Sequence, residues 1–412
     1  MSQETLGRIL DRIDEYREHV IDMQTRLTAI PAIGPDNGGE GEAEKMRCVL
    51  EFLNDLDPNE IVEINAPDNR VPAGYRPNLF VRFKGSASTR TIWVMSHMDI
   101  VPPGDLSLWN SDPYQVVEKD GKLYGRGTED DQQGFISPFL ALKAMKEEGI
   151  TPAFNVGLAI VSDEESGSKF GIQHALKERP DLFSKEDLIY IPDAGDPEGI
   201  TMEVAEKSIL WIKVETLGKQ THGSTPEKGI NAHKAAAHLV VKMNDLYRDF
   251  PDTDPLYDPP VSTFEPTRKM ENVSNINTIP GSDIVFFDCR VLPRYSLENL
   301  KHQARTYADE IEKEFGVRIS LGFPQDETAP DPTSPDAPAV QTLKKAIHEI
   351  HGKNAKAVGI GGGTVAAYFR RAGLPAVCWC TLDDTLHGPN EYSVIKNVLN
   401  DAKVFAHIFL QR

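Results

Sequence analysis

Apolar side chains recur at helical spacing in the first thirty residues of the chain. Steps of four and three residues separate them, which places them along one face of a helix. They are Ile9, Ile13, Tyr16, Val20, Met23, Leu27 and Ile30. Pro31 and the Gly34-Pro35 pair predict the end of this helix. A second helix is expected over residues 46–56, where apolar positions recur in the same way.

Further along the chain, short apolar runs rich in branched residues alternate with helical patterns. Such runs are typical of buried strands, and their alternation with helices favours a largely parallel sheet covered on both faces. Strands are expected at residues 91–96, 155–162, 188–191, 357–360 and 376–381, and helices at 135–148, 339–351, 365–371 and 394–410. The sequence therefore predicts an α/β protein with a mostly parallel sheet.

The middle of the chain follows a different pattern, which begins with a strand of alternating apolar and charged residues at 211–216. After it we expect a helix at 231–250, strands at 275–279 and 284–292, a helix at 297–315 and a strand at 317–323. This β-α-β-β-α-β order predicts a ferredoxin-like α+β lid inserted into the α/β domain. A stretch rich in Pro, Asp and Thr at 324–338 indicates the linker out. We expect the α/β domain at residues 1–207 and 327–412, and the lid at 208–326.

Composition restricts the class of protein. A chain of 412 residues exceeds the size of one hydrophobic core, so two domains are expected. The net charge of −19 disfavours nucleic-acid binding. No signal peptide or membrane-spanning run is recognisable, and the four cysteines form no C-x-x-C pair. We expect a soluble, cytoplasmic protein with no nucleic-acid or membrane partner.

Acidic and imidazole side chains follow the predicted strands of the α/β domain. They are His97 and Asp99 after 91–96, Asp130 and Asp131 in a Gly-rich loop, Glu164 and Glu165 after 155–162, Asp193 after 188–191, and His387 after 376–381. Each motif by itself is more typical of a turn or a solvated loop. Ligands bind at the carboxyl ends of strands in such sheets, and clustered carboxylates need a counter-charge. Together these residues predict a metal site with nitrogen and oxygen ligands.

Several of these motifs resemble one known family in order and spacing. They are Ser96-His97-Met98-Asp99 with Val101-Pro102, Trp109 with Asp112-Pro113-Tyr114, the run 121–127, Asp163-Glu164-Glu165-Ser166-Gly167, His222-Gly223-Ser224-Thr225-Pro226 and His387-Gly388-Pro389. The family is that of the zinc exopeptidases and deacylases related to carnosinase. It includes glutamate carboxypeptidase, aminoacylase, acetylornithine deacetylase and succinyl-diaminopimelate desuccinylase. The resemblance covers nearly the whole chain.

The resemblance implies a role for each residue of the metal site. The residues that match the family's ligands are His97 and Asp193 for one zinc ion, Glu165 and His387 for the other, and Asp130 as the bridge. Asp99 would orient His97 by accepting its free ring N–H. Glu164 would be the general base that deprotonates the attacking water, whose pKa zinc lowers towards about 7. Cobalt or manganese could replace zinc.

The resemblance also implies a role for residues of the lid and of one later loop. His222 would help to hold the oxyanion and, in dimeric members, reaches the partner's active site. Asn277 and Arg290 would bind substrate from neighbouring lid strands, and Arg290 suits a bidentate carboxylate contact. The loop 359–364, with Gly362, Gly363 and Thr364, would lie against the substrate carboxylate. No lysine precedes Thr364, so a nucleotide-binding loop is not supported.

The resemblance divides the substrate prediction, because the Asp130-Asp131 pair and the Glu165-Ser166-Gly167 run are similar to the carnosinase-like dipeptidases, whereas the inserted lid is shorter than in that branch. The sequence also departs from the family at three positions. Gln132 and Gln133 stand where many members have a lysine, and Asp193 stands where the deacylase branch has glutamate. The leading hypothesis is a dizinc hydrolase that cleaves an amide bond in dipeptides or other small substrates with a free carboxylate, as a dipeptidase or carboxypeptidase. The alternatives are an N-acyl amino acid deacylase, of the acetylornithine or succinyl-diaminopimelate type, and a non-catalytic binding relative. A homodimer formed through the lid is expected.

Overall fold

The computed structural model describes residues 3–411 and divides them into two compact units. The first unit holds the residues up to Val204, together with Thr333–Ala357 and the chain from Tyr368 onward. The second unit holds Ala205–Pro332 and Val358–Ala367. Among the helices of residues 3–411, none has the length and apolar composition that a membrane-spanning helix needs.

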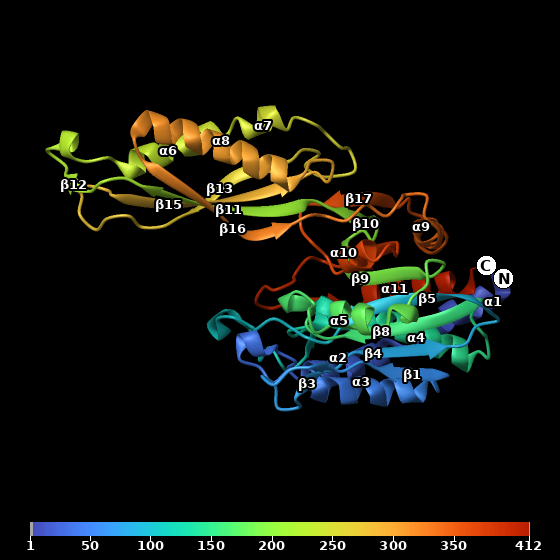
Figure 1. Cartoon of the computed structure of the whole chain (residues 1–412). Coiled ribbons are helices and arrows are strands. Elements are labelled where there is room, and N and C mark those ends of the chain that lie inside the picture. The colour runs from blue at the N-terminus through green and yellow to red at the C-terminus, as the bar shows by residue number, and fades with distance from the viewer. Residues whose placement is uncertain (1–2, 412) are drawn as a thin grey trace. The chain divides into compact units, whose positions relative to one another are not determined.

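The first unit is built on an eight-stranded sheet (Figure 1). In spatial order its strands are β1 (Glu60–Glu63), β4 (Leu79–Phe83), β8 (Phe154–Val161), β5 (Ala87–His97), β9 (Leu188–Asp196), β18 (Ala376–Thr381), β10 (Thr201–Glu206) and β17 (Lys356–Ile360). The four central strands, β8 to β18, are parallel to one another, as expected for buried apolar runs. The pairs β1–β4, β4–β8 and β10–β18 are antiparallel. The parallel centre places four strand ends at one edge of the sheet.

Helices flank this sheet and bury its apolar side chains. They are α1 (Gln3–Asp14), α2 (Arg17–Thr28), α3 (Ala43–Asp55), α4 (Gln133–Glu147), α5 (Ile172–Glu178), α9 (Pro338–His351), α10 (Ala366–Arg371) and α11 (Ile395–Leu410). The single helix expected up to Ile30 is wrong in one respect, because the chain breaks between α1 and α2 at Tyr16. Ile13, Tyr16 and Val20 are nevertheless all buried, so the apolar periodicity continues across the break and does not reveal it.

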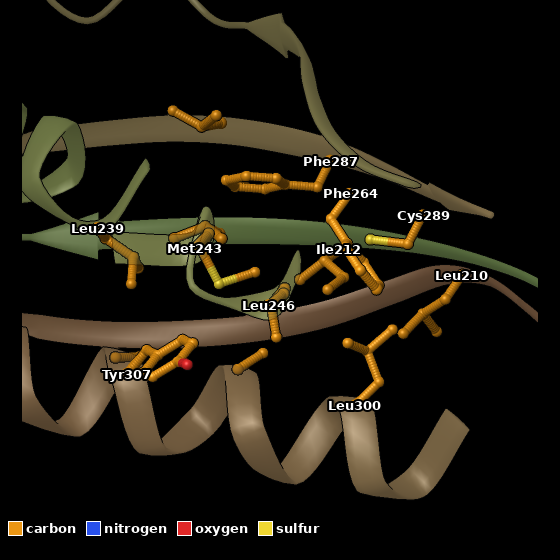
Figure 2. Close-up of a cluster of buried hydrophobic side chains, with 14 of the residues drawn as sticks. Leu210, Ile212, Leu239, Met243, Leu246, Phe264, Phe287, Cys289, Leu300 and Tyr307 are labelled. Atoms are coloured by element: carbon orange, nitrogen blue, oxygen red, sulfur yellow. The ribbon is translucent and has the colours of Figure 1, made fainter. Parts of the chain in front are cut away.

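The second unit has the ferredoxin-like arrangement. Its strands are β11 (Ser208–Leu217), β13 (Thr263–Lys269), β15 (Ser282–Val291) and β16 (Arg318–Glu327), in the spatial order β13-β15-β11-β16, and every pair is antiparallel. The helices α6 (Ala232–Met243), α7 (Leu246–Asp249) and α8 (Leu297–Phe315) lie over one face of this sheet (Figure 1). Alternate residues of β11 and β15, such as Leu210, Ile212 and Phe287, point into a core against these helices (Figure 2).

One strand of the second unit lies where the sequence did not predict it. The strand expected at 275–279 is only the two-residue β14 (Thr278–Ile279), which pairs with β12 (Thr221–His222) outside the main sheet. The second strand of the sheet is β13, which lies at an edge and buries only Phe264. With a single buried side chain, β13 lacks the apolar alternation by which strands are recognised. The helix expected to reach residue 250 ends at Met243 and is followed by α7.

Candidate metal centre

The ends of the central parallel strands carry the predicted metal ligands. His97 is the last residue of β5, Glu165 lies in the short turn after β8, and Asp193 lies near the end of β9. Asp130 lies in the turn that precedes α4, and His387 lies in the loop after β18. These side chains converge because the carboxyl ends of neighbouring parallel strands meet at one edge of a sheet.

The carboxylate of Asp130 lies between two imidazole rings. Its Oδ1 is 2.9 Å from Nε2 of His97, and its Oδ2 is 3.1 Å from Nε2 of His387. The same nitrogen of His387 is 3.1 Å from Oε2 of Glu165, and Nε2 of His97 is 3.7 Å from Oδ1 of Asp193. One carboxylate thus faces both halves of the predicted ligand set, which is the geometry that a bridging ligand requires.

Charge and burial shift the pKa values of these groups strongly. Burial favours the neutral form of Asp130, but hydrogen bonds with His387 and His97 hold its pKa below the usual carboxyl range. Hydrogen bonds to Asp130 and Glu165 raise the pKa of His387 to about 10. Burial and neighbouring carboxylates raise the pKa values of Glu165 and Asp193. The cluster therefore stabilises positive charge at its centre, as a cation site does.

Asp99 joins two of the ligand-bearing loops through its carboxylate. Its two oxygens accept hydrogen bonds from the backbone N–H groups of Glu164 and Glu165, each at 3.0 Å. For Nδ1 of His97, the nearer oxygen is the backbone carbonyl of Asp99 at 3.0 Å, and the carboxylate Oδ1 is 3.6 Å away. Asp99 therefore holds the turn of Glu164 and Glu165 in place, and its main chain contributes to the orientation of His97.

Asp131, one of the acidic residues from which the sequence predicts a metal site, is part of the centre, although the family resemblance assigns it no role. It forms a second compact group with His97 and Asp193, alongside the group of His97, Asp130 and Glu165. Its Oδ2 accepts the backbone N–H of His97 at 3.2 Å. A Cβ atom on Gly134 would lie 2.0 Å from Oδ1 of Asp131, so the carboxylate fits only because that residue is glycine. The signal in the sequence was the Asp130-Asp131 pair followed by this glycine.

Two buried carboxylate oxygens without hydrogen-bond partners in residues 3–411 indicate whether the cluster fits a metal ion. Oδ1 of Asp131 and Oε1 of Glu165 are buried and have no hydrogen-bond partner among the described residues. Buried carboxylate oxygens are costly unless they are paired, and cations bound by these two groups would compensate the charge of each carboxylate. Imidazole nitrogen with carboxylate oxygen is a donor set that suits zinc and also admits cobalt or manganese. The residues therefore fit one or more divalent ions.

The structure brings other residues to the centre that the sequence interpretation missed. Arg126, Glu129 and Glu391 are all buried beside the loops of Asp130 and His387. Glu391 follows the His387-Gly388-Pro389 motif by two residues, but an isolated glutamate in a loop has no distinguishing pattern. Gln132 is also buried, and its Oε1 accepts a hydrogen bond from Thr28 at 3.0 Å. Nothing in the structure explains why glutamine replaces lysine at Gln133.

The predicted substrate-binding residues lie in the second unit, in two groups. Arg290 donates from Nε and Nη2 to the carboxylate of Asp288, at 2.6 and 3.0 Å, and from Nη1 to the carbonyl of Gly361 at 2.9 Å. Arg290 therefore contacts the residue that directly precedes Gly362, Gly363 and Thr364 in the predicted substrate loop. The hydroxyl of Thr364 donates to Glu206 at 2.7 Å.

The second group of predicted substrate residues is His222 with Asn277. His222 is exposed on β12, and its Nδ1 lies 2.8 Å from the hydroxyl of Ser224. The backbone carbonyl of Asn277 accepts the N–H of Gly223 at 2.6 Å. The expectation that Asn277 and Arg290 lie on neighbouring strands is wrong, because Asn277 lies in the turn before β14, and β14 pairs with β12 outside the main sheet.

Comparisons with known proteins identify relatives of the whole chain. Residues 93–411 match the model of peptidase family M20/M25/M40. An uncharacterized metallohydrolase of Methanococcus maripaludis is 39% identical, over 95% of this chain and 98% of that protein. A succinyl-diaminopimelate desuccinylase of Nitratiruptor is 27% identical, over 90% of this chain and 94% of that protein. The crystal structure of human carnosine dipeptidase 1 has the same fold, with a TM-score of 0.70 at 18% identity over 98% of this chain and 99% of that chain.

Proposed function

The chain is a metal-dependent hydrolase of peptidase family M20/M25/M40, and we propose that it uses two zinc ions to cleave an amide bond in small substrates that carry a free carboxylate. The observation that carries the proposal is Asp130, whose two carboxylate oxygens face His97 and His387 separately. Asp193 accompanies His97, and Glu165 accompanies His387. In this proposal each imidazole binds one ion, and Asp130 is shared.

Glu164 is proposed to carry the proton in the reaction. Two bound ions would polarise the scissile carbonyl and lower the pKa of a nearby water molecule. Burial and the charge of Asp193 raise the pKa of Glu164 well above the usual carboxyl range. A carboxylate with a raised pKa is suited to accept the proton of the attacking water and to return it to the leaving nitrogen as the C–N bond breaks. Asp99 holds the backbone of Glu164 for this purpose.

Arg290 is the group that we propose to recognise the substrate carboxylate. Its guanidinium is oriented by Asp288 and Gly361, and these contacts use only three of its five N–H donors. A substrate carboxylate could accept the remaining donors. Arg290→Ala should raise KM for substrates with a free carboxylate and have little effect on the same substrates in amidated form. Equal losses on both forms would contradict this role.

The length of the second unit supports a proposal about assembly. The strand β12 lies at one end of this unit (Figure 1) and carries His222, and Asn277 adjoins its partner β14. Arg290 is near the end of β15, whose first residue, Ser282, follows β14 closely in the chain. From Ser282 to Arg290 the strand advances about eight residues, or ~26 Å at ~3.3 Å per residue. A two-residue substrate extends roughly 7 Å along its backbone. We propose that one substrate contacts Arg290 of one copy and His222 of a second, in a homodimer.

The substrate class divides into two candidates, a dipeptide and an N-acyl amino acid. The dipeptide is favoured by Asp193, and the N-acyl amino acid by the relatives that are named desuccinylases. The test is hydrolysis by zinc-loaded protein of a dipeptide panel and of a panel of acetyl and succinyl amino acids, with metal content measured on the same sample. The proposal expects two zinc equivalents and turnover on one panel. Full activity with one equivalent, or no turnover on either panel, would refute it.

A cytoplasmic location is also proposed. Cys48, Cys289 and Cys380 are buried thiols outside any disulfide, which is usual in a reducing compartment. Fractionation of the source cells, with an antibody against the chain, would test the location.

A further inference from the structure

The two loops that carry Asp130 and His387 are joined by a pair of buried glutamates, each of which accepts hydrogen bonds from the other loop. Oε1 of Glu391 accepts the backbone N–H groups of Gly127, Glu129 and Asp130, at 3.0, 3.0 and 3.1 Å. In return, the carboxylate of Glu129 accepts the N–H groups of Asp383 and Thr385, at 2.7 and 2.6 Å. Each loop therefore supplies the acceptor for the backbone of the other.

Arg126 completes this connection and is almost fully buried. Its Nη1 donates to Oε2 of Glu391 at 2.6 Å, and its Nη2 donates to the carbonyl groups of His387 and Gly388, each at 3.1 Å. The guanidinium also lies 5.3 Å from the ring of Trp109. We call Arg126, Glu129 and Glu391 the loop clamp. None of the three is a ligand in the proposed site.

Apart from the shared Asp130, the loop clamp contacts the loop of only one proposed ligand, His387. His97 ends β5, whose hydrogen bonds to β8 and β9 fix its position without the clamp. His387 lies on a loop, at a positive φ of 58°, and 57% of its side chain is exposed. Its ring meets Asp130 and Glu165, so the distance between His387 and Asp130 depends on how firmly their loops are joined.

We propose that Glu391, together with Arg126 and Glu129, is a positioning group that sets the affinity of the ion shared by Asp130, Glu165 and His387, and leaves the ion at His97 and Asp193 nearly unchanged. The inference rests on the two-ion site proposed above. Removing groups that orient metal ligands typically costs 10- to 100-fold in metal affinity. The loss should fall mainly on one of the two equivalents, because Asp130 belongs to both ions, whereas among the ligands of a single ion the clamp contacts only the loop of His387.

The experiment compares metal binding by the wild-type chain, Glu391→Gln and Glu129→Gln. Each variant keeps the shape of the side chain and removes its charge, so a donor amide replaces one acceptor oxygen. Apoprotein is titrated with Zn²⁺ against a chelator of known affinity, and Co²⁺-loaded protein is followed by its visible absorption spectrum. Glu203→Gln is the matched control, because Glu203 is an equally buried carboxylate that pairs with Arg370 in the same unit.

The expected result is a loss of about tenfold or more in affinity for one equivalent in both clamp variants, with the other equivalent within about threefold of wild type. The Co²⁺ spectrum of the weakened equivalent should also change in the clamp variants. The control Glu203→Gln should lower the thermal midpoint of unfolding and leave the affinities for both metal equivalents unchanged. Equal loss of both equivalents, or the same profile in Glu203→Gln, would overturn the inference. If one clamp variant fails to fold, the other decides the question. Fewer than two equivalents in the wild-type chain would instead refute the proposed function.

Discussion

If His222 acts on the substrate of a second copy, two inactive chains should restore each other. The chains are His222→Ala, which keeps Glu164, and Glu164→Ala, which keeps His222. The segment of β15 from Ser282 to Arg290 spans about 26 Å, and His222 belongs to the β12–β14 pair before the Ser282 end, so one copy of the second unit is not expected to place both side chains on one small substrate. A site made from the first chain's Glu164 and the second chain's His222 would contain every required group.

The size of the recovery follows from the symmetry of a dimer. Equal amounts of the two chains, allowed to exchange fully, give about half heterodimers, and each heterodimer has one intact site and one doubly defective site. The mixture should therefore reach about a quarter of the wild-type activity per chain. If His222 acts within its own chain, every site in the mixture lacks either His222 or Glu164, and no activity should return.

The assay is hydrolysis of the best substrate after the two chains have been mixed, partly unfolded in urea and refolded together with zinc. Glu227→Ala, an exposed change on the same tip of the second unit, is the control for damage to that tip and should be active alone. Light scattering establishes whether the mixture is dimeric. A dimeric mixture that stays inactive would refute the reasoning from the length of β15, and so would a monomeric chain with full activity.

Three further predictions follow from individual side chains. Glu164→Gln should lower kcat by about 10²–10⁴-fold with metal content unchanged, and loss of one metal equivalent would instead make Glu164 a ligand. Phe287→Ala, in the core of the second unit (Figure 2), should cost about 3–5 kcal/mol of unfolding free energy in urea, whereas Phe286→Ala on the other face should cost much less; equal costs would contradict the assigned core. Asp401 is buried against Thr381, and burial raises its pKa to about 7. The folded state therefore binds the proton of Asp401 more tightly than the unfolded state does. The stability that the protonated carboxyl group gives to the folded state is lost as pH rises from about 4 towards 7. Asp401→Asn should gain stability relative to wild type across that window, by at most about 1.4 kcal/mol per pH unit, and a difference that does not vary with pH would refute the assignment.

The sequence by itself determined the elements that have strong local patterns. The helix expected at 297–315 is α8, because Ser296 caps its start, apolar residues repeat along one face, and Gly316 ends it at a positive φ. The buried parallel strands were predicted from apolar runs in the same way. Since ligand-bearing loops follow these strands, the convergence of His97, Glu165 and His387 could also be predicted before the structure was known.

Only the tertiary structure decided the features that depend on contacts between distant segments. The edge strand β13 has one buried residue and is a strand because β15 pairs with it. The loop 358–367 groups with the second unit through contacts such as Gly361 with Arg290, which its own residues do not indicate. Glu391 accepts backbone N–H groups more than two hundred residues away, and Asp131 fits beside His97 only in the folded chain. Local patterns record propensity and burial along one element, whereas these hydrogen bonds exist only after the chain has brought its loops together.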